Sequence, residues 1–128
     1  MTSVLGQVLA VAVGGAVGSA LRFLTSLWVH GLLGRGFPYG TLAVNFLGCL
    51  LMGLLFELFL ERLASEGILR AAVLIGFLGG FTTFSAFSIE TLNLVEQGAL
   101  LKAVINVAGS VILCLGATWI GVVLGRQL

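Results

Sequence analysis

The sequence predicts an all-α integral membrane protein with four transmembrane helices, and three observations support this fold class. The chain has only 128 residues, of which 59% are apolar and 9% are charged. Apolar runs of about 18 residues or more mark membrane-spanning helices. Four such runs occur, at roughly 4–28, 38–59, 69–95 and 99–124. Little sequence remains for loops, so residues 1–128 are predicted to form a single transmembrane domain in the lipid bilayer.

Other features of the composition exclude several classes of protein. The first residues lack a basic start and a small-residue cleavage site, so no signal peptide is expected. Near-balanced charge gives no basic patch for nucleic acid. There is no Ser/His/Asp set, metal cluster or phosphate loop, which argues against an enzyme. Cys49 and Cys114 have no metal-ligand spacing and are interpreted as small buried hydrophobic residues.

The positive charges give almost no signal for orientation. Cytoplasmic loops normally carry an excess of Lys and Arg. With four spans, three cations fall on each side of the membrane: Arg62, Arg70 and Arg126 on one, Arg22, Arg35 and Lys102 on the other. A chain without bias can insert both ways, so the hypothesis is a dual-topology protein that assembles as an antiparallel homodimer. The alternative is that one strong site fixes a single orientation.

The first helix contains small residues and one cation. Gly14 and Gly18 form a small-xxx-small face that lets another helix approach closely. Arg22 follows near the interface, where it could either extend to the headgroups or lie at the mouth of an anion path. Spacing alone does not decide between these. His30 is expected in the glycine-rich loop that follows, as a solvated histidine.

The second helix is predicted to begin with Pro38 in its first turn. Asn45 places an amide within the apolar span, with Thr41 one turn earlier on the same face. The amide could form an interhelical hydrogen bond, or it could be a donor that lines a pore. The charged residues that end this helix are interpreted as a solvated helix end: Glu57, Glu61, Arg62 and Glu66.

The third span contains the most unusual stretch, residues 76–90. Glycines loosen a helix, and hydroxyl groups at membrane depth are tolerated only in buried protein or along a water-filled path. The helix is therefore expected to break within residues 79–83, which exposes amides that attract anions and carbonyls that attract cations. Phenylalanines follow at positions i, i+3 and i+6, with hydroxyls among them: Phe81, Phe84 and Phe87, with Thr82, Thr83, Ser85 and Ser88. Because aromatic ring edges are positive, this pattern favours an anion, although such a stripe alone commonly means packing.

The fourth helix has polar or thiol residues at every fourth position: Lys102, Asn106, Ser110 and Cys114. They form one face, which should turn toward protein or water. Gly121 and Gly125 give a further small-xxx-small pair.

Residues 79–90, which read GGFTTFSAFSIE, resemble the core motif of the Fluc (CrcB) family of fluoride ion channels. The similarity extends over the whole chain, through the glycine-rich first helix that ends near Arg22 and through residues 38–45 of the second helix. Two residues depart from the family pattern. Asn106 stands where tyrosine or another polar residue is expected in some relatives, and Cys114 stands where a serine would extend the polar track.

The resemblance implies a fluoride-selective channel that exports cytoplasmic fluoride and gives fluoride resistance. It implies a dual-topology antiparallel homodimer in the bacterial inner membrane, with two pores built by both subunits. The residues that it assigns to the pore are Asn45, Phe84, Phe87, Thr82, Thr83, Ser85, Ser88, Ser110 and Thr41, with Arg22 and Glu90 at the pore ends. It also implies a central structural sodium ion held by the backbone carbonyls of Gly79 and Thr82 from both subunits.

Two other functions compete with a channel. A small drug/proton exporter with four helices would need a carboxylate in the middle of the first helix. The first helix has no Asp or Glu, which counts against this class. A membrane scaffold without transport would leave the polar residues of the third span without a purpose.

Overall fold

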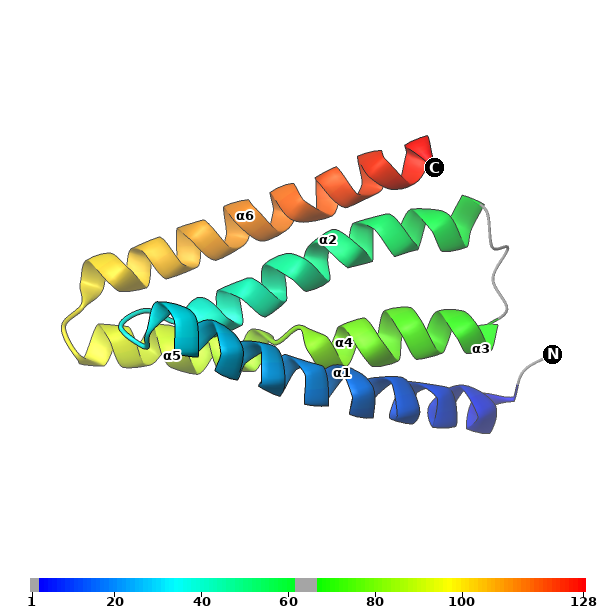
Figure 1. Cartoon of the computed structure of the whole chain (residues 1–128), viewed down its shortest axis with the longest axis horizontal. Coiled ribbons are helices and arrows are strands. Elements are labelled where there is room, and N and C mark those ends of the chain that lie inside the picture. Colours follow the sequence, from blue (N-terminus) through cyan, green and yellow to red (C-terminus); the bar gives the residue numbers. More distant parts are fainter. Residues whose placement is uncertain (1–2, 62–66) are drawn as a thin grey trace.

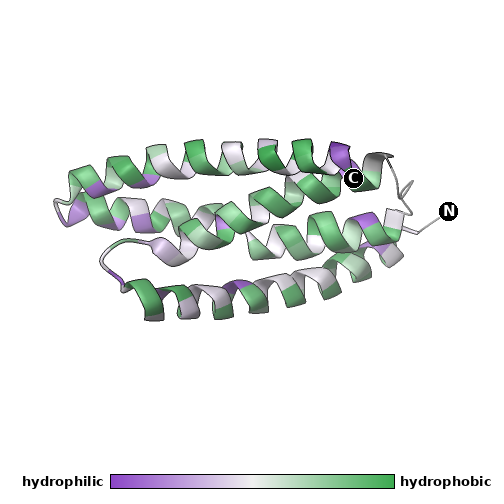
Figure 2. Ribbon diagram, turned by 45° about the horizontal axis from the view of Figure 1, so that its top comes forward, coloured by the Kyte–Doolittle hydropathy of each residue, from purple (hydrophilic) through white to green (hydrophobic). Residues whose placement is uncertain are grey.

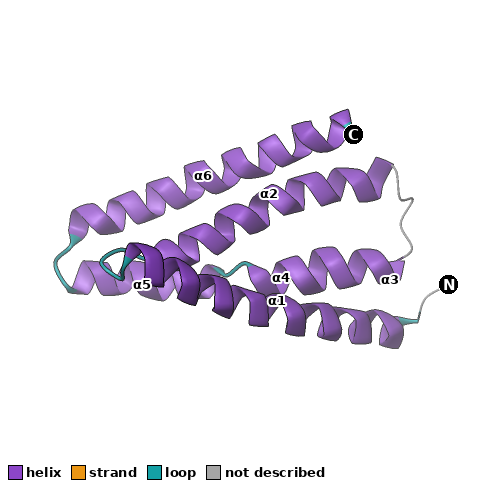
Figure 3. Ribbon diagram, in the orientation of Figure 1, coloured by secondary structure: helices purple, strands orange, loops and turns teal. Residues whose placement is uncertain are grey.

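The structure, a computed structural model, describes residues 3–61 and 67–128 as a bundle of four long spans (Figure 1). The first, second and fourth spans are continuous helices, and the third is divided into several pieces (Figure 3). In chain order the elements are α1 (Val4–Leu33), α2 (Tyr39–Glu61), α3 (Gly67–Arg70), the π-helical η1 (Ala71–Leu78), α4 (Gly79–Phe81), α5 (Phe84–Glu96) and α6 (Leu100–Gln127).

All four spans are long and apolar enough to cross a membrane, which confirms the predicted fold class. Apolar residues cover most of the length of each helix (Figure 2). The chain's N- and C-terminal ends lie at the same end of the bundle, as an even number of spans requires (Figure 1).

The first helix is longer than predicted and ends at Leu33, so His30 lies in its last turn. The prediction of a solvated loop histidine was therefore wrong. The ring of His30 is half-buried, and its Nδ1 lies 3.1 Å from the carbonyl oxygen of Gly34. Gly34 adopts a φ of 81°, a left-handed conformation that glycine enters at little cost, and it ends the helix.

The third span breaks at Thr82 and Thr83, within the predicted segment. Thr82 has φ and ψ of −85° and 157°, and Thr83 has −151° and 119°, so both backbones are extended. The hydroxyl of Thr82 donates to the carbonyl of Leu78, and the hydroxyl of Thr83 accepts from the amide of Ala86. The two threonines thus end one half-helix and cap the next.

Glycines allow two close helix contacts in the bundle. A Cβ added at Gly14 or Gly18 of α1 would overlap the carbonyl of Ala72 or Phe77 on the third span. A Cβ added at Gly121 of α6 would overlap the carbonyl of Leu50 on α2. The predicted small-xxx-small faces therefore pack helices within one chain.

Replacing Gly18 with valine is expected to lower the free energy of unfolding by about 3 kcal/mol or more, because rigid backbone must move. Denaturant unfolding in detergent, followed by circular dichroism, measures this. Gly31→Val is the matched control in the same helix, since an added Cβ there would meet no described atom within 4 Å apart from its chain neighbours and the backbone of its own helix. Equal stability of the two variants would mean that the α1 contact is loosely packed.

The second helix does not end in a row of solvated charges. Glu57 is buried, and its Oε1 lies 3.4 Å from Nε of Arg126. The prediction that Glu57 is solvated was wrong, because α6 packs over this face of α2. Arg62 and Glu66 lie outside the described residues, as does the side chain of Glu61.

Candidate functional site

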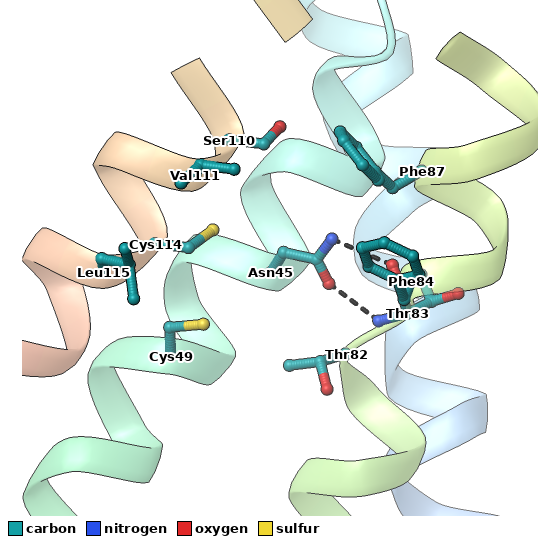
Figure 4. Close-up of a pocket in the computed structure, with 10 residues that line it drawn as sticks. All are labelled: Asn45, Cys49, Thr82, Thr83, Phe84, Phe87, Ser110, Val111, Cys114 and Leu115. Atoms are coloured by element: carbon teal, nitrogen blue, oxygen red, sulfur yellow. Dashed lines mark hydrogen bonds between the residues drawn. The ribbon is translucent and has the colours of Figure 1, made fainter. Parts of the chain in front are cut away.

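Two cavities meet at the break in the third span, and Thr83 lines both. The first, here called the phenylalanine cavity, has a volume of about 360 Å³ and lies between α2, α5 and α6 (Figure 4). It is lined by Asn45, Cys49, Thr82, Thr83, Phe84, Phe87, Ser110, Val111, Cys114 and Leu115. The second, the arginine cavity, has about 230 Å³ and is lined by Ser19, Arg22, Phe23, Ser26, Thr41, Val44, Thr83, Ala86 and Glu90.

Asn45 holds the break with both ends of its amide. Its Oδ1 accepts a 2.7 Å hydrogen bond from the Thr83 backbone N–H, and its Nδ2 donates a 3.0 Å bond to the Thr83 carbonyl (Figure 4). Unpaired backbone groups at membrane depth cost several kcal/mol, so this pairing makes the break tolerable. The sequence left interhelical bonding and pore lining as alternatives for Asn45. The structure has the interhelical bond, and the same side chain also lines the phenylalanine cavity.

The pairing with Asn45 changes the hydrogen bonding of α4. In a continuous helix the Thr83 N–H would donate to the carbonyl of Gly79. Because that N–H donates to Asn45 instead, the Gly79 carbonyl lacks its usual helical donor. The break therefore presents backbone oxygen in the middle of a span, where carbonyl dipoles suit a cation.

Phe84 and Phe87 both line the phenylalanine cavity, with ring centroids 5.4 Å apart and planes tilted by 45°. The two rings lie beside each other at the cavity and are not stacked face to face (Figure 4). Phe84 is 77% exposed in the single chain, so core packing does not explain it. Phe81 differs, since it is buried and stacks on Phe77 with centroids 6.1 Å apart.

The predicted polar face of the fourth helix turns toward protein at its centre. Asn106 and Ser110 are buried, whereas Lys102 is exposed and donates to the carbonyl of Gly36. The Asn106 amide donates a 2.9 Å hydrogen bond to the hydroxyl of Thr91, which links α6 to α5. Ser110 is within 3.5 Å of the Asn106 oxygen, so a chain of polar groups runs from the phenylalanine cavity along this face.

The arginine cavity gathers the two charges that were predicted at the pore ends. Arg22 and Glu90 both line it, although their helices are far apart in sequence. Oε1 of Glu90 accepts a 2.9 Å hydrogen bond from the Thr41 hydroxyl. Nε of Arg22 and Oε2 of Glu90 are buried without a hydrogen-bond partner among the described residues. Arg22 is therefore partly buried, and its side chain faces the arginine cavity.

Eight of the eleven residues predicted for the pore and its ends line one of the two cavities, and Thr83 lines both. Ser85 and Ser88 line neither cavity and are exposed. The hydroxyl of Ser85 lies 3.3 Å from that of Thr83, so it remains next to the break.

Sequence reasoning missed several residues of these cavities. Ser19 and Ser26 line the arginine cavity with Arg22, and their spacing of i, i+3 and i+7 would have placed all three on one helix face. Cys49 and Cys114 are not fully buried, and both line the phenylalanine cavity. Their interpretation as buried hydrophobic residues was wrong, because the two helices leave a space at that level.

Comparisons with known proteins give a consistent result. Residues 9–122 match the family model described as CrcB-like protein, Camphor Resistance (CrcB). The fluoride-specific ion channel FluC of Magnetococcus marinus is 51% identical over 120 residues, which cover 94% of this chain and 98% of that protein. FluC of Geobacter sulfurreducens is 51% identical over 121 residues, with 94% and 98% covered. FluC of Methylococcus capsulatus is 55% identical over 119 residues, but the chain spans only 52% of its length.

Proposed function

The chain belongs to the CrcB-like family, and we propose that it is a fluoride-specific ion channel of the bacterial inner membrane. The observation that carries this proposal is the identity of about half of all residues to fluoride channels that it matches over nearly their whole length. The cavities at the break support it, since they supply ring edges, hydroxyls and a guanidinium to an anion.

In this proposal fluoride passes between the arginine cavity and the phenylalanine cavity. Arg22 attracts the anion, and the groups around the break replace part of its hydration shell. Phe84 and Phe87 meet the ion with their ring edges, which carry partial positive charge. Discrimination against chloride then depends on a narrow path with dense donors, because fluoride is smaller and more tightly hydrated.

The transport is passive and needs no coupling ion. In acid surroundings neutral HF crosses the membrane and dissociates in the less acidic interior. The membrane potential, negative inside, then drives fluoride out through the channel at about 2.3 kcal/mol per charge for each 100 mV. The expected consequence is resistance of the cell to fluoride.

We propose further that two copies assemble in antiparallel orientation. Ser85, Ser88 and most of Phe84 are exposed next to the break, where lipid would meet polar groups if the chain stood alone. A second copy turned upside down would cover this face and complete the phenylalanine cavity with its own rings. The equal division of Lys and Arg between the two sides supports insertion in both directions.

Dual topology can be tested with single cysteines added at each end of a cysteine-free chain in intact cells. Labelling of each terminus by a membrane-impermeant reagent is expected for about half of the molecules. Labelling of both termini in all molecules, or of neither terminus in any, contradicts the proposal.

The backbone of the break fits a resident sodium ion between the two copies. The Gly79 carbonyl lacks its helical donor, and carbonyl oxygens at a broken helix are suitable ligands for Na⁺. Gly79 and Thr82 of both copies would hold the ion, which would neutralise the facing carbonyl dipoles. Replacement of Na⁺ by a large organic cation is expected to lower fluoride flux, and unchanged flux after exhaustive exchange would contradict this.

Anion efflux from liposomes that carry the purified protein tests the function directly. Fluoride- and chloride-selective electrodes should record rapid loss of fluoride without loss of chloride. Efflux of both anions at similar rates would contradict fluoride selectivity. A folded protein that passes neither anion would contradict channel function, and proton-coupled cation export would then be the function to assay.

A further inference from the structure

The two cysteines of the chain come from different helices but line the same cavity. Cys49 lies on α2 and Cys114 on α6, and both side chains are half-buried. Both residues belong to the lining of the phenylalanine cavity. Figure 4 shows both sulfur atoms on the cavity side of their helices, and both lie below Ser110 in this view. The chain has no other cysteine.

We propose that Cys49 and Cys114 form a two-thiol binding site for a soft, thiophilic cation in the wall of the phenylalanine cavity, and that the bound cation blocks the channel. Thiolates select soft d¹⁰ cations such as Cu⁺, while carboxylates and carbonyls suit harder ones. Two sulfur ligands satisfy a linear two-coordinate ion of this kind, such as Hg²⁺, without a third protein ligand.

The space and the chemistry at this position suit such an ion. The cavity of about 360 Å³ has room for a cation and is lined mainly by apolar atoms, so uncharged HgCl2 can enter it from the membrane or from water. Binding is a balanced exchange: HgCl2 and two thiols give the dithiolate complex, two protons and two chloride ions. No oxidant or reductant takes part.

The position explains the expected block. Asn45, Phe87 and Ser110 line the same cavity as the two cysteines. A metal ion fixed by Cys49 and Cys114 would narrow the space before the phenylalanine rings, and this obstruction would block the passage of an anion. The blocking effect rests on the proposed function, whereas the binding site does not.

Binding is tested first, on the detergent-purified protein without any measurement of flux. One equivalent of HgCl2 per chain is expected to remove both thiols from reaction with a colorimetric thiol reagent. In competition with free cysteine, Cys49→Ser and Cys114→Ser should each have an affinity for Hg²⁺ at least about 100-fold lower than that of the unmodified chain. Each variant offers only one thiol, so the ion no longer gains from a second ligand held close to the first. Affinity in the single variants equal to that of the unmodified chain would mean that the thiols act independently, and would overturn the site.

Fluoride efflux from liposomes then tests the block, with each variant compared with its own flux before HgCl2. The unmodified chain should be blocked, and an excess of a dithiol should restore efflux. The Cys49→Ser/Cys114→Ser double variant should not respond, and a block of that variant would overturn the proposal. Tight binding without a block would support the thiol site and refute its position in the ion path. Absence of fluoride flux in the untreated protein would instead refute the proposed function.

Discussion

Replacing Asn45 with leucine is expected to reduce fluoride efflux by roughly 100-fold, which corresponds to about 2.7 kcal/mol of barrier. Leucine has similar volume but can pair with neither backbone group of Thr83. The N–H and the carbonyl that Asn45 now satisfies at 2.7 and 3.0 Å would lose their partners. Each unpaired buried group costs about 1–3 kcal/mol, so the break should reorganise or the variant should lose stability. Liposome efflux and denaturant unfolding measure the two effects separately.

Two further variants distinguish the loss of the hydrogen bonds between Asn45 and Thr83 from a general effect of replacing asparagine with another residue. Asn45→Asp keeps an acceptor for the Thr83 N–H and loses the amide donor, so its stability should lie between those of the asparagine and leucine proteins. Asn93→Leu makes the same replacement at an exposed position of α5 and should leave unfolding nearly unchanged. Asn45→Leu could instead lose flux while its stability and its helix break remain unchanged. Asn45 would then act as a hydrogen-bond donor to the ion, and its bonds to Thr83 would not be needed to hold the break.

The sequence was sufficient to predict the spans and the break, for reasons that are local. Four apolar runs predict four helices because length and composition alone decide whether a helix can cross a bilayer. Gly79 and Gly80 followed by Thr82 and Thr83 predict a break because glycine weakens the helix and the hydroxyls supply the caps. These signals need no information about neighbouring helices.

The pairings across the bundle were not predictable in the same way. The hydrogen bond from Asn45 to Thr83 joins positions that are 38 residues apart. The contact between Glu57 and Arg126 joins the C-terminal part of α2 to the C-terminal end of α6. Both depend on the rotation and register of packed helices, which glycine contacts at Gly18 and Gly121 fix. A sequence pattern gives the face of a helix but not the residue that this face meets, so the charges at position 57 and in the arginine cavity could be placed only by the structure.

The phenylalanine rings give the other large expected effect. Phe84→Ile and Phe87→Ile keep apolar bulk and remove two aromatic rings that line the cavity, together with the partial positive charge of their edges. Each is expected to lower fluoride efflux by roughly tenfold or more, or about 1.4 kcal/mol of barrier, because aliphatic groups carry little positive charge. Phe84 is 77% exposed in the single chain, so its replacement should barely change the stability of one subunit.

Phe81→Ile provides the matched control, since this ring is buried against Phe77 and lines neither cavity. It should lower the free energy of unfolding by about 1 kcal/mol, because isoleucine repacks imperfectly in the space of the ring. The efflux through each folded channel should fall less than in the Phe84 and Phe87 variants. The three variants therefore distinguish phenylalanines that line the ion path, at positions 84 and 87, from a phenylalanine that packs in the core, at position 81. Full efflux in the Phe84 and Phe87 variants would mean that the rings only fill space, and the selectivity would then have to come from Asn45, the hydroxyls of the break and Arg22.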